Sequence, residues 1–600
     1  MLKIQHEIQG PLRTTCAAIL LIGACSLYTC QSTLAQATLF EEQQSAPKSS
    51  DPLPTDLISK LDATVARVMK EGYVPGLSVA LIKDGQLVWQ HGYGVINADT
   101  RQPVTDATVF EAASLSKPAF AYAVMKLVES GKIDLDQPLA RYLPEPYIPN
   151  DGRLDQITAR RVLSHTSGLP NWRTAQSLQI YFTPGERFSY SGEGYVYLQK
   201  VVERVTGKPL EEFMRETVFA PLGMTSSSYV WQSKYERLKA FSHAVSGSVS
   251  GRAKPTEANA AATLHTTAAD YAKFVTAILD RKGLTEATVR EMLRPQIRVA
   301  ADCYECLEVK PEKLSETISW GLGWGLMRDP SGDCFWHWGD NGDTRAYVVA
   351  FDWRKTGVVI FANSANGLSI VDEIVFQALG VRQPQLTWLD YESYDSSSKR
   401  LYKDILTRGQ PAIADYRAHR KDAGGDGPIP ERRMRAIGYQ MLAKNLSKEA
   451  AEIFRLNAED YPTSANAFDG LGEAYMRAGD DEAAIKQFQR AHELDSKLGH
   501  ATAVLKRLQN PSVVVEPKVL QSYVGRYEAP FGVLNIDTVG RRLWVQVGED
   551  SPAELIPQSD TSFVVARIGA RLTFRGNGKG EVSQININLG GEQFQAKRIK

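Results

Sequence analysis

The chain has 600 residues, of which 43% are hydrophobic and 23% are charged, so it is long enough for several folded domains. Its 69 basic and 69 acidic residues balance, and no long basic run is present, which argues against a nucleic-acid partner. The nine histidines are scattered, with none in a His-Glu-x-x-His arrangement, so we expect neither a metal site nor a cofactor.

Residues 1–37 are typical of a signal peptide. Lys3 and Arg13 precede an apolar run at residues 17–24 that is too short for a transmembrane helix. Ala35-Gln-Ala37 has the small-x-small form of an ordinary signal-peptidase site, whereas Ile22-Gly-Ala-Cys25 resembles a lipoprotein box. We favour the first site and expect an exported, periplasmic protein. The alternative is an outer-membrane lipoprotein, with a membrane contact only if Cys25 is lipidated.

A polar, proline-containing stretch at residues 38–54 is predicted to be a linker, and an amphipathic helix follows it. Two apolar runs on either side of Asp84-Gly85 predict a β-hairpin with a tight turn.

The next segment, residues 110–120, places Ser114 three residues before Lys117 where a helix begins. Residues three apart share a helix face, so the lysine amine can reach the serine hydroxyl. The pair is therefore a candidate nucleophile with its base. Ser-x-x-Lys occurs three times in the chain, however, and Ser114 taken alone is as well explained as a helix cap.

Two later segments favour the catalytic interpretation. Tyr190 lies in a predicted loop before a helix at residues 196–205. His337, Trp338 and Gly339 lie in a segment flanked by predicted strands at 320–324, 347–351 and 358–362. His165 lies in a compact turn, where we interpret it as a buried histidine that stabilises the turn.

Three cysteines remain after the signal peptide: Cys303, Cys306 and Cys334. Export permits disulfides. The spacing predicts a local structural disulfide or a bridge to Cys334, and does not decide between these pairings.

The ordered set of Ser-x-x-Lys, tyrosine loop and His-x-Gly resembles the penicillin-recognising serine hydrolases, in the branch of class C β-lactamases, D-alanyl-D-alanine carboxypeptidases and related esterases. Supporting segments are Pro75–Ala80, Leu163–Pro170 and Ala220–Thr225. The resemblance covers roughly residues 55–385. It implies an α+β catalytic domain of the β-lactamase/transpeptidase type, in which an antiparallel sheet is flanked by helices and joined to a helical subdomain.

Carried over by position, the resemblance implies a catalytic role for each motif residue. Ser114 is the nucleophile, Lys117 its base or proton relay, and Tyr190 the proton shuttle. His337 replaces the lysine of a Lys-Thr-Gly triplet. Gly339 lets the strand approach the substrate, and the backbone N–H groups of Ser114 and Asp340 form the oxyanion hole.

Three positions depart from the family pattern. Gly192 stands where an asparagine is usual, Trp338 replaces a small or hydroxyl residue, and Asp340 adds a carboxylate beside the predicted oxyanion hole. A carboxylate-bearing substrate is expected to be repelled there. We therefore expect an esterase-like preference for small neutral esters, which stack on Trp338.

The second half contains two further units. Within the predicted helical segment at residues 395–508, Gly438 and Phe454 correspond to Gly472 and Phe488 at a period of 34, which is the tetratricopeptide pattern. Such helices often bind a protein partner, although a spacer role explains them equally well. Short strands at 515–600 predict a small antiparallel β-domain.

The sequence thus predicts an exported serine hydrolase that cleaves an ester or amide of a small-molecule or peptide substrate. The alternatives are a carboxypeptidase or β-lactamase acting on peptidoglycan-type substrates, and a catalytically silent module that binds a partner.

Overall fold

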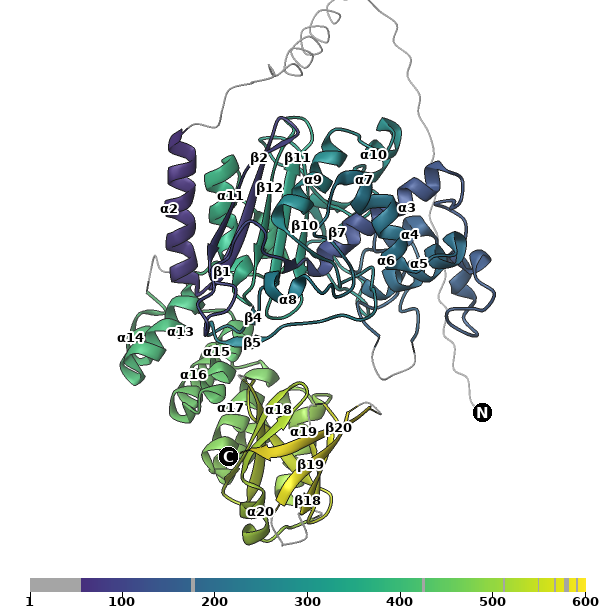
Figure 1. Ribbon diagram of the computed structural model, residues 1–600. Coiled ribbons are helices and arrows are strands. Elements are labelled where there is room, and N and C mark those ends of the chain that lie inside the picture. The colour runs from purple at the N-terminus through teal and green to yellow at the C-terminus, as the bar shows by residue number, and fades with distance from the viewer. Residues whose placement is uncertain are drawn as a thin grey trace, which may run out of the picture. The chain divides into compact units, whose positions relative to one another are not determined.

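The computed structural model describes residues 55–599 apart from 174–177, 423–426, 511–512, 549, 566–567, 577–581 and 590–591 (Figure 1). The predicted signal peptide, with both cleavage patterns and Cys25, and the predicted linker lie outside the described residues. Among the helices of the described part, none is both long and apolar enough to cross a membrane.

The first part is built on an eight-stranded antiparallel sheet in the order β2-β1-β12-β11-β10-β9-β8-β7. The strands are β1 (Gly76–Lys83), β2 (Gln86–Gly94), β7 (Ile297–Ala300), β8 (Leu314–Trp320), β9 (Gly325–Met327), β10 (Cys334–Asp340), β11 (Arg345–Phe351) and β12 (Thr356–Ala362). The predicted hairpin is confirmed. Asp84 and Gly85 connect β1 to β2 with φ of 52° and 72°, as a tight turn of this kind requires.

One predicted strand is wrong. Residues 320–324 were expected to be extended, but β8 ends at Trp320 and β9 begins at Gly325. Gly323 turns the chain with φ of 86°, and a Cβ there would lie 2.4 Å from the Cβ of Ala121. The glycine-rich segment is therefore a close turn against a helix.

Helices cover both faces of the sheet (Figure 1). Alternate side chains of β1 enter different cores: Leu77, Val79 and Leu81 pack with α2 and α11, whereas Ala80 and Ile82 belong to the core that includes α3, α5 and α9. The helices of this part are α2 (Thr55–Gly72), α3 (Ser116–Glu129), α4 (Ala159–Leu163), α5 (Gly192–Thr206), α6 (Leu210–Met214), α7 (Ala220–Leu222), α8 (Tyr235–Leu238), α9 (Ala268–Leu279), α10 (Glu286–Met292), α11 (Val371–Leu379) and α12 (Pro384–Trp388). Short strand pairs join β3 (Phe110–Glu111) to β6 (His265–Thr266), and β4 (Ser242–His243) to β5 (Val249–Gly251).

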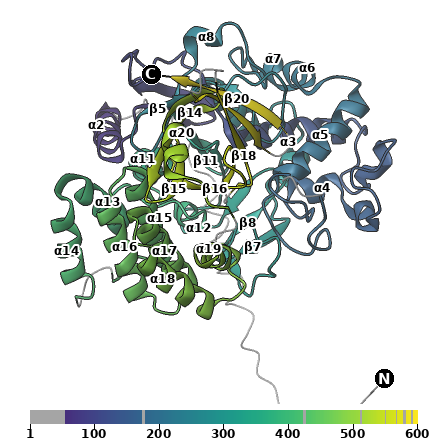
Figure 2. The ribbon, with the colours of Figure 1, turned by 90° about the horizontal axis from the view of Figure 1, so that it is seen from below.

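Seven helices follow, and from α15 onward each packs against the next (Figure 2). They are α13 (Ser397–Arg408), α14 (Gln410–His419), α15 (Glu431–Ala443), α16 (Ser447–Asp460), α17 (Ala465–Ala478), α18 (Asp481–Leu494) and α19 (Gly499–Gln509). A Cβ at Gly438 would lie 2.5 Å from the ring of Phe454, and one at Gly472 would lie 2.9 Å from the ring of Phe488. The 34-residue period of the sequence thus corresponds to a contact that recurs in the structure, in which a glycine of one helix packs against a phenylalanine ring of the next. The tetratricopeptide assignment itself stays a prediction.

The last part is a closed barrel of eight antiparallel strands preceded by α20 (Pro517–Tyr523), which makes the predicted β-domain a barrel. Pairing of Arg526 with Ile599 closes it. The strands are β13 (Gly525–Ala529), β14 (Gly532–Val539), β15 (Arg542–Val547), β16 (Ala553–Pro557), β17 (Ser562–Val565), β18 (Arg571–Gly576), β19 (Val582–Leu589) and β20 (Glu592–Ile599).

Candidate active site

Ser114 lies in a short 3-10 turn, η1 (Ala113–Leu115), between β3 and α3. Ala113 has φ of 48°, a left-handed conformation that is unfavourable for a residue with a Cβ and that recurs at functional sites. The cap position of α3 is Leu115, and no side chain caps the helix. The Ser114 hydroxyl therefore does not cap the helix and is available to act as a nucleophile.

Lys117 is fully buried beside Ser114. Its Nζ lies 3.0 Å from the Ser114 Oγ and donates a hydrogen bond to the carbonyl oxygen of Ala261 at 2.8 Å. Burial lowers the pKa of Lys117 to about 7, although the negative charge of Glu305 acts in the opposite direction. Near neutral pH a large fraction of this amine is uncharged and can accept the Ser114 proton.

Tyr190 lies two residues before the start of α5 and faces the same pair. Its ring centroid is 4.8 Å from the Lys117 Nζ, and its backbone N–H donates to the Tyr304 carbonyl at 2.8 Å. Burial raises the pKa of Tyr190 well above its usual value, and its hydroxyl has no hydrogen-bond partner among the described residues. The hydroxyl stays protonated and is suited to give a proton to a leaving group.

His337, on β10, is fully buried next to Tyr190, with 6.2 Å between the ring centroids. Its Nδ1 lies 2.8 Å from the Trp338 carbonyl oxygen, which can only accept, so Nδ1 carries the proton and Nε2 is an acceptor. No described residue hydrogen-bonds to Nε2. Burial, followed by the nearby Lys117 charge, lowers the pKa of His337 to about 3. The residue is therefore neutral and does not supply the positive charge of the lysine that it replaces.

His165 is a buried turn histidine, as the sequence indicated. It has φ of 55°, and its Nδ1 accepts a hydrogen bond of 2.9 Å from the backbone N–H of Ser191. Its ring centroid lies 4.3 Å from that of Tyr190. His165 thus also positions the tyrosine loop, a role that its sequence context did not indicate.

Gly339 allows β10 to lie close to the segment that leads to Ser114. A Cβ at this position would be 2.4 Å from the carbonyl oxygen of Ala112. The two segments that carry the predicted oxyanion-hole N–H groups, those of Ser114 and Asp340, therefore pack together at the glycine.

The Asp340 carboxylate is compensated, contrary to the expected unpaired charge. Its Oδ1 lies 2.6 Å from an Arg345 guanidinium nitrogen and accepts from the Gly342 N–H at 2.9 Å, while the Tyr391 hydroxyl donates to Oδ2. The turn after β10 supplies Gly342 and Arg345, whereas Tyr391 is 51 residues away in the sequence. Electrostatic repulsion by Asp340 is therefore a weaker basis for selectivity than the sequence suggested.

Trp338 is not an exposed stacking surface. It is 4% exposed and packs on Tyr190, with ring centroids 4.6 Å apart. Its side chain belongs to the core beneath the tyrosine loop, so the expected stacking of a substrate on Trp338 is not available in this structure.

Gly192 begins α5 instead of lying in a loop before it, because the helix starts four residues earlier than predicted. A Cβ at Gly192 would lie 2.7 Å from the backbone oxygen of Asn171 and 3.1 Å from its Oδ1. The side-chain amide of Asn171 thus occupies the space next to position 192.

Four residues near the site were not predicted from the sequence: Asn171, Trp172, Tyr304 and Glu305. They carry no motif, and the contact between Asn171 and Glu305 joins positions 134 residues apart.

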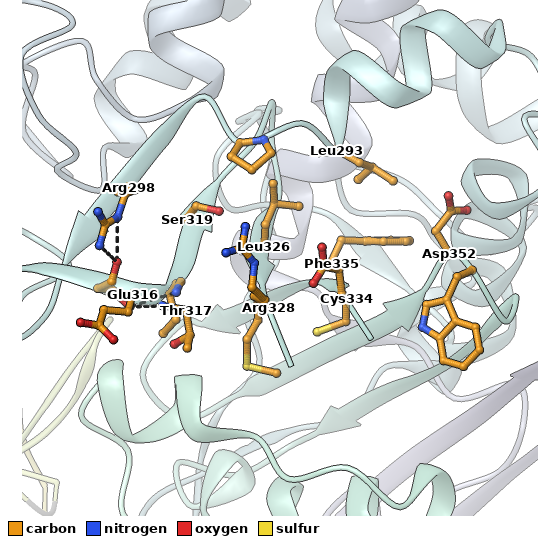
Figure 3. A pocket seen from close by; sticks show the side chains of 16 residues that line it. Leu293, Arg298, Glu316, Thr317, Ser319, Leu326, Arg328, Cys334, Phe335 and Asp352 are labelled. Atoms are coloured by element: carbon orange, nitrogen blue, oxygen red, sulfur yellow. Dashed lines mark hydrogen bonds between the residues drawn. The ribbon is translucent and has the colours of Figure 1, made fainter. Parts of the chain in front are cut away.

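A hollow of about 640 Å³ lies elsewhere, along β8, β9 and the start of β10 (Figure 3). It is lined by Arg298, Glu316, Arg328, Asp352 and Trp353, among other residues. None of the candidate catalytic residues lines it, so we do not assign it to the reaction.

The chain is similar to several known proteins. Protein flp of Staphylococcus aureus (strain MRSA252) is 24% identical over 336 residues, which is 52% of this chain and 64% of the relative. Esterase EstB of Burkholderia gladioli is 30% identical over 205 residues, or 29% of this chain and 52% of the esterase. The chain thus spans less than two thirds of the length of these curated relatives. A solved class C β-lactamase is 19% identical with a TM-score of 0.48, covering 56% of this chain and 99% of that structure.

The sequence model of the Beta-lactamase family matches residues 61–378, which is 53% of the chain and includes every candidate catalytic residue described above. The chain therefore belongs to the Beta-lactamase family.

Proposed function

We propose that the protein is a serine hydrolase that cleaves an ester or amide through an acyl-enzyme on Ser114, with an esterase-like activity. The observation that carries this proposal is the buried pair of Lys117 Nζ and Ser114 Oγ, 3.0 Å apart, with a lysine pKa of about 7. A neutral amine at this distance is a competent general base for the serine hydroxyl.

The residues support a two-step reaction. Lys117 takes the proton of Ser114 as Oγ forms a bond to the substrate carbonyl carbon, and the backbone N–H groups of Ser114 and Asp340 stabilise the oxyanion. The bond to the leaving group then breaks as Tyr190 gives its proton to the leaving oxygen or nitrogen and takes up the proton held by Lys117, which leaves Lys117 neutral again. Water attacks the acyl-enzyme with Lys117 as base, and Lys117 passes that proton to Ser114 Oγ as the acid product leaves.

Esterase activity is favoured over β-lactamase or carboxypeptidase activity by two features. His337 is neutral, so it gives no charge to anchor the carboxylate that penicillins and peptide C-termini carry. A named esterase is also among the relatives. The alternatives remain a hydrolase of peptidoglycan-type substrates and a silent module whose helices α13–α19 bind a protein partner. We further propose export to the periplasm, on the basis of the N-terminal sequence alone.

Labelling with a fluorophosphonate probe tests this proposal. We expect the wild-type protein to gain one adduct at Ser114, and we expect Ser114→Ala to gain none. As a matched control, Ser116→Ala removes a neighbouring hydroxyl that donates to the Ala113 carbonyl at 2.5 Å, accepts from the Leu264 N–H at 3.0 Å and bonds to no catalytic group, so this variant should still be labelled. An unlabelled wild-type protein would support the silent module.

A further inference from the structure

Two loops meet beside Lys117, and neither contributes a residue to the reaction proposed above. Trp172 is 44% exposed, and its ring centroid lies 5.8 Å from the Lys117 Nζ, although the lysine itself is fully buried. Glu305, also exposed, accepts a hydrogen bond of 2.7 Å from the Asn171 side-chain amide. An indole and a carboxylate thus stand at the solvent side of the catalytic pair.

Gly192 fixes the position of the first loop. The backbone oxygen of Asn171 accepts from the N–H groups of Gly192 at 3.0 Å and Glu193 at 2.9 Å. A Cβ at Gly192 would also lie 3.3 Å from the Trp172 ring. Asn171 and Trp172 therefore sit where any side chain at position 192 would stand, directly against the start of α5.

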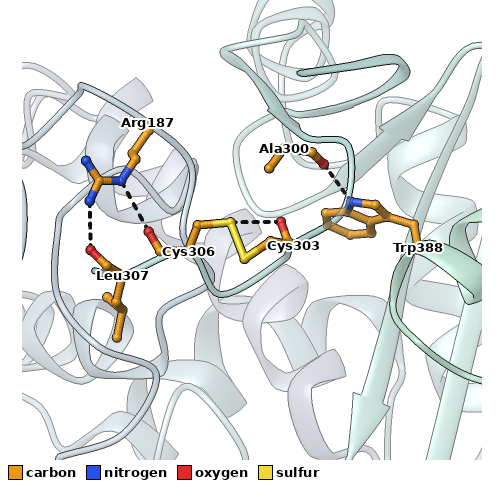
Figure 4. The surroundings of a disulfide bond; sticks show 6 residues. All are labelled: Arg187, Ala300, Cys303, Cys306, Leu307 and Trp388. Atoms are coloured by element: carbon orange, nitrogen blue, oxygen red, sulfur yellow. Dashed lines mark hydrogen bonds between the residues drawn. A yellow bond between two sulfur atoms is a disulfide. The ribbon is translucent and has the colours of Figure 1, made fainter. Parts of the chain in front are cut away.

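The second loop is held at several points (Figure 4). A disulfide joins Cys303 to Cys306 across Tyr304 and Glu305, which resolves the pairing that the sequence left open and leaves Cys334 free and buried. Arg187 donates to the carbonyls of Cys306 at 3.2 Å and Leu307 at 2.7 Å, and the Trp388 indole donates to the Ala300 carbonyl at 2.8 Å. The Tyr304 carbonyl receives the Tyr190 N–H described above, so the loop is attached to the catalytic segment itself.

The charge at this edge of the site is negative. Among the described residues, no ion pair joins Glu305 to a basic side chain, and Arg173 and Arg345 pair with Glu193 and Asp340. The negative charge of Glu305 favours the ammonium form of Lys117 and so acts to raise the pKa of the lysine. A hollow of about 810 Å³ is lined in part by Glu305, and its charged lining residues are Asp302, Glu305, Glu308, Glu312, Lys310 and Lys313, four acids against two bases.

We propose that Trp172 and Glu305 form a subsite for a positively charged group of the substrate, such as an ammonium or guanidinium, next to the bond that is cleaved. The ring face attracts a cation, and the carboxylate neutralises it. Asn171 and the Cys303–Cys306 disulfide position the two groups. This inference rests on the proposed hydrolase function and names its substrate class. Cationic esters or amides are preferred over neutral ones, and esters or amides that carry a carboxylate are disfavoured.

A pair of isosteric esters tests the subsite. A trimethylammonium-ethyl ester and its neutral 3,3-dimethylbutyl counterpart have the same shape and differ in charge. We expect the wild type to favour the cationic ester by about tenfold in kcat/KM, the range open to a cation held by an indole and a carboxylate. The ratio of the two values should fall toward one in Glu305→Gln and in Trp172→Ala. Glu316→Gln, which makes the same charge change in the hollow of Figure 3, should retain the wild-type ratio.

Two further measurements separate this inference from the proposed function. A wild type that hydrolyses both esters equally, or a Glu305→Gln variant that keeps the preference, would overturn the subsite and leave the hydrolase intact. If neither ester is cleaved and Ser114 stays unlabelled, the hydrolase proposal fails. Calorimetric titration of Ser114→Ala with the two esters then still decides the subsite, since tighter binding of the cationic ester supports it and equal binding refutes it.

Discussion

At the scale of single residues, the site depends on a lysine whose pKa burial lowers to about 7. Lys117 is fully buried, and within the described part of the chain its amine hydrogen-bonds to the Ser114 hydroxyl and the Ala261 carbonyl. The neighbouring His337 and His165 are also neutral, because burial lowers the pKa of each. Lys117 is therefore the group whose protonation governs the nucleophile.

This arrangement predicts the pH dependence of the reaction. Burial lowers the pKa of Lys117 to about 7, and the base works only when deprotonated. We expect kcat/KM for a neutral ester to rise with pH through about 7 and then to level off. A profile that is flat between pH 5.5 and about 8.5 would exclude Lys117 as the base.

Substitution of the proton-transfer residues should separate catalysis from folding. We expect Lys117→Ala and Tyr190→Phe each to reduce kcat by about 10²–10⁴-fold, the usual range for a general acid or base. Circular dichroism and the melting temperature report whether the fold persists. Near-full activity of a folded Lys117→Ala protein would contradict the assignment.

At the scale of elements, the site depends on how closely β10 approaches η1. Gly339→Ala places a Cβ 2.4 Å from the Ala112 carbonyl oxygen, which must move the strand or the turn. We expect a loss of at least about tenfold in kcat/KM, since small displacements of a preorganised oxyanion hole are costly. Gly152→Ala is the matched control, because a Cβ there meets no atom within 4 Å. Equal activity of the two variants would refute this account of Gly339.

A buried ion pair joins Lys239, which follows α8, to β3 next to this turn. Lys239 donates to Glu111 of β3 at 2.6 Å, and the Asn341 amide donates to the other carboxylate oxygen at 3.2 Å. Lys239→Met leaves the carboxylate buried and unpaired, so we expect a loss of about 3–5 kcal/mol in the free energy of unfolding, measured with urea. The double variant Glu111→Gln, Lys239→Met should recover part of that loss. A single variant as stable as the wild type would show that the pair is solvated.

At the scale of the whole molecule, the sequence predicted most of the elements but not how the site is completed. Periodicity located the hairpin at Asp84–Gly85 and the repeated helices, because local spacing controls both. It misassigned residues 320–324, where packing against α3 requires a turn. The rim formed by Asn171, Trp172 and Glu305 depends on contacts between distant loops, and the compensation of Asp340 depends on Arg345 and Tyr391. Neither arrangement has a local signature.

The helical segment and the barrel share a small core that can be tested. Trp544 of β15 is 4% exposed and packs with residues of α17–α19, and the Arg477 guanidinium lies 5.0 Å from its ring centroid. We expect Trp544→Ala to cost about 3–5 kcal/mol in stability, as large-to-small changes in cores do. Limited proteolysis should then cut α17–α19 faster. An unchanged digestion pattern would mean that the barrel does not stabilise these helices.

The central claim is that Ser114 carries the acyl group during turnover. The most direct measurement is rapid quenching of the wild-type protein with a slowly hydrolysed ester, followed by intact mass and peptide mapping. The account predicts a mass increase equal to one acyl group, located on Ser114 and absent from Ser114→Ala. Hydrolysis of the ester with no acylated protein, or with the acyl group on another residue, would contradict it.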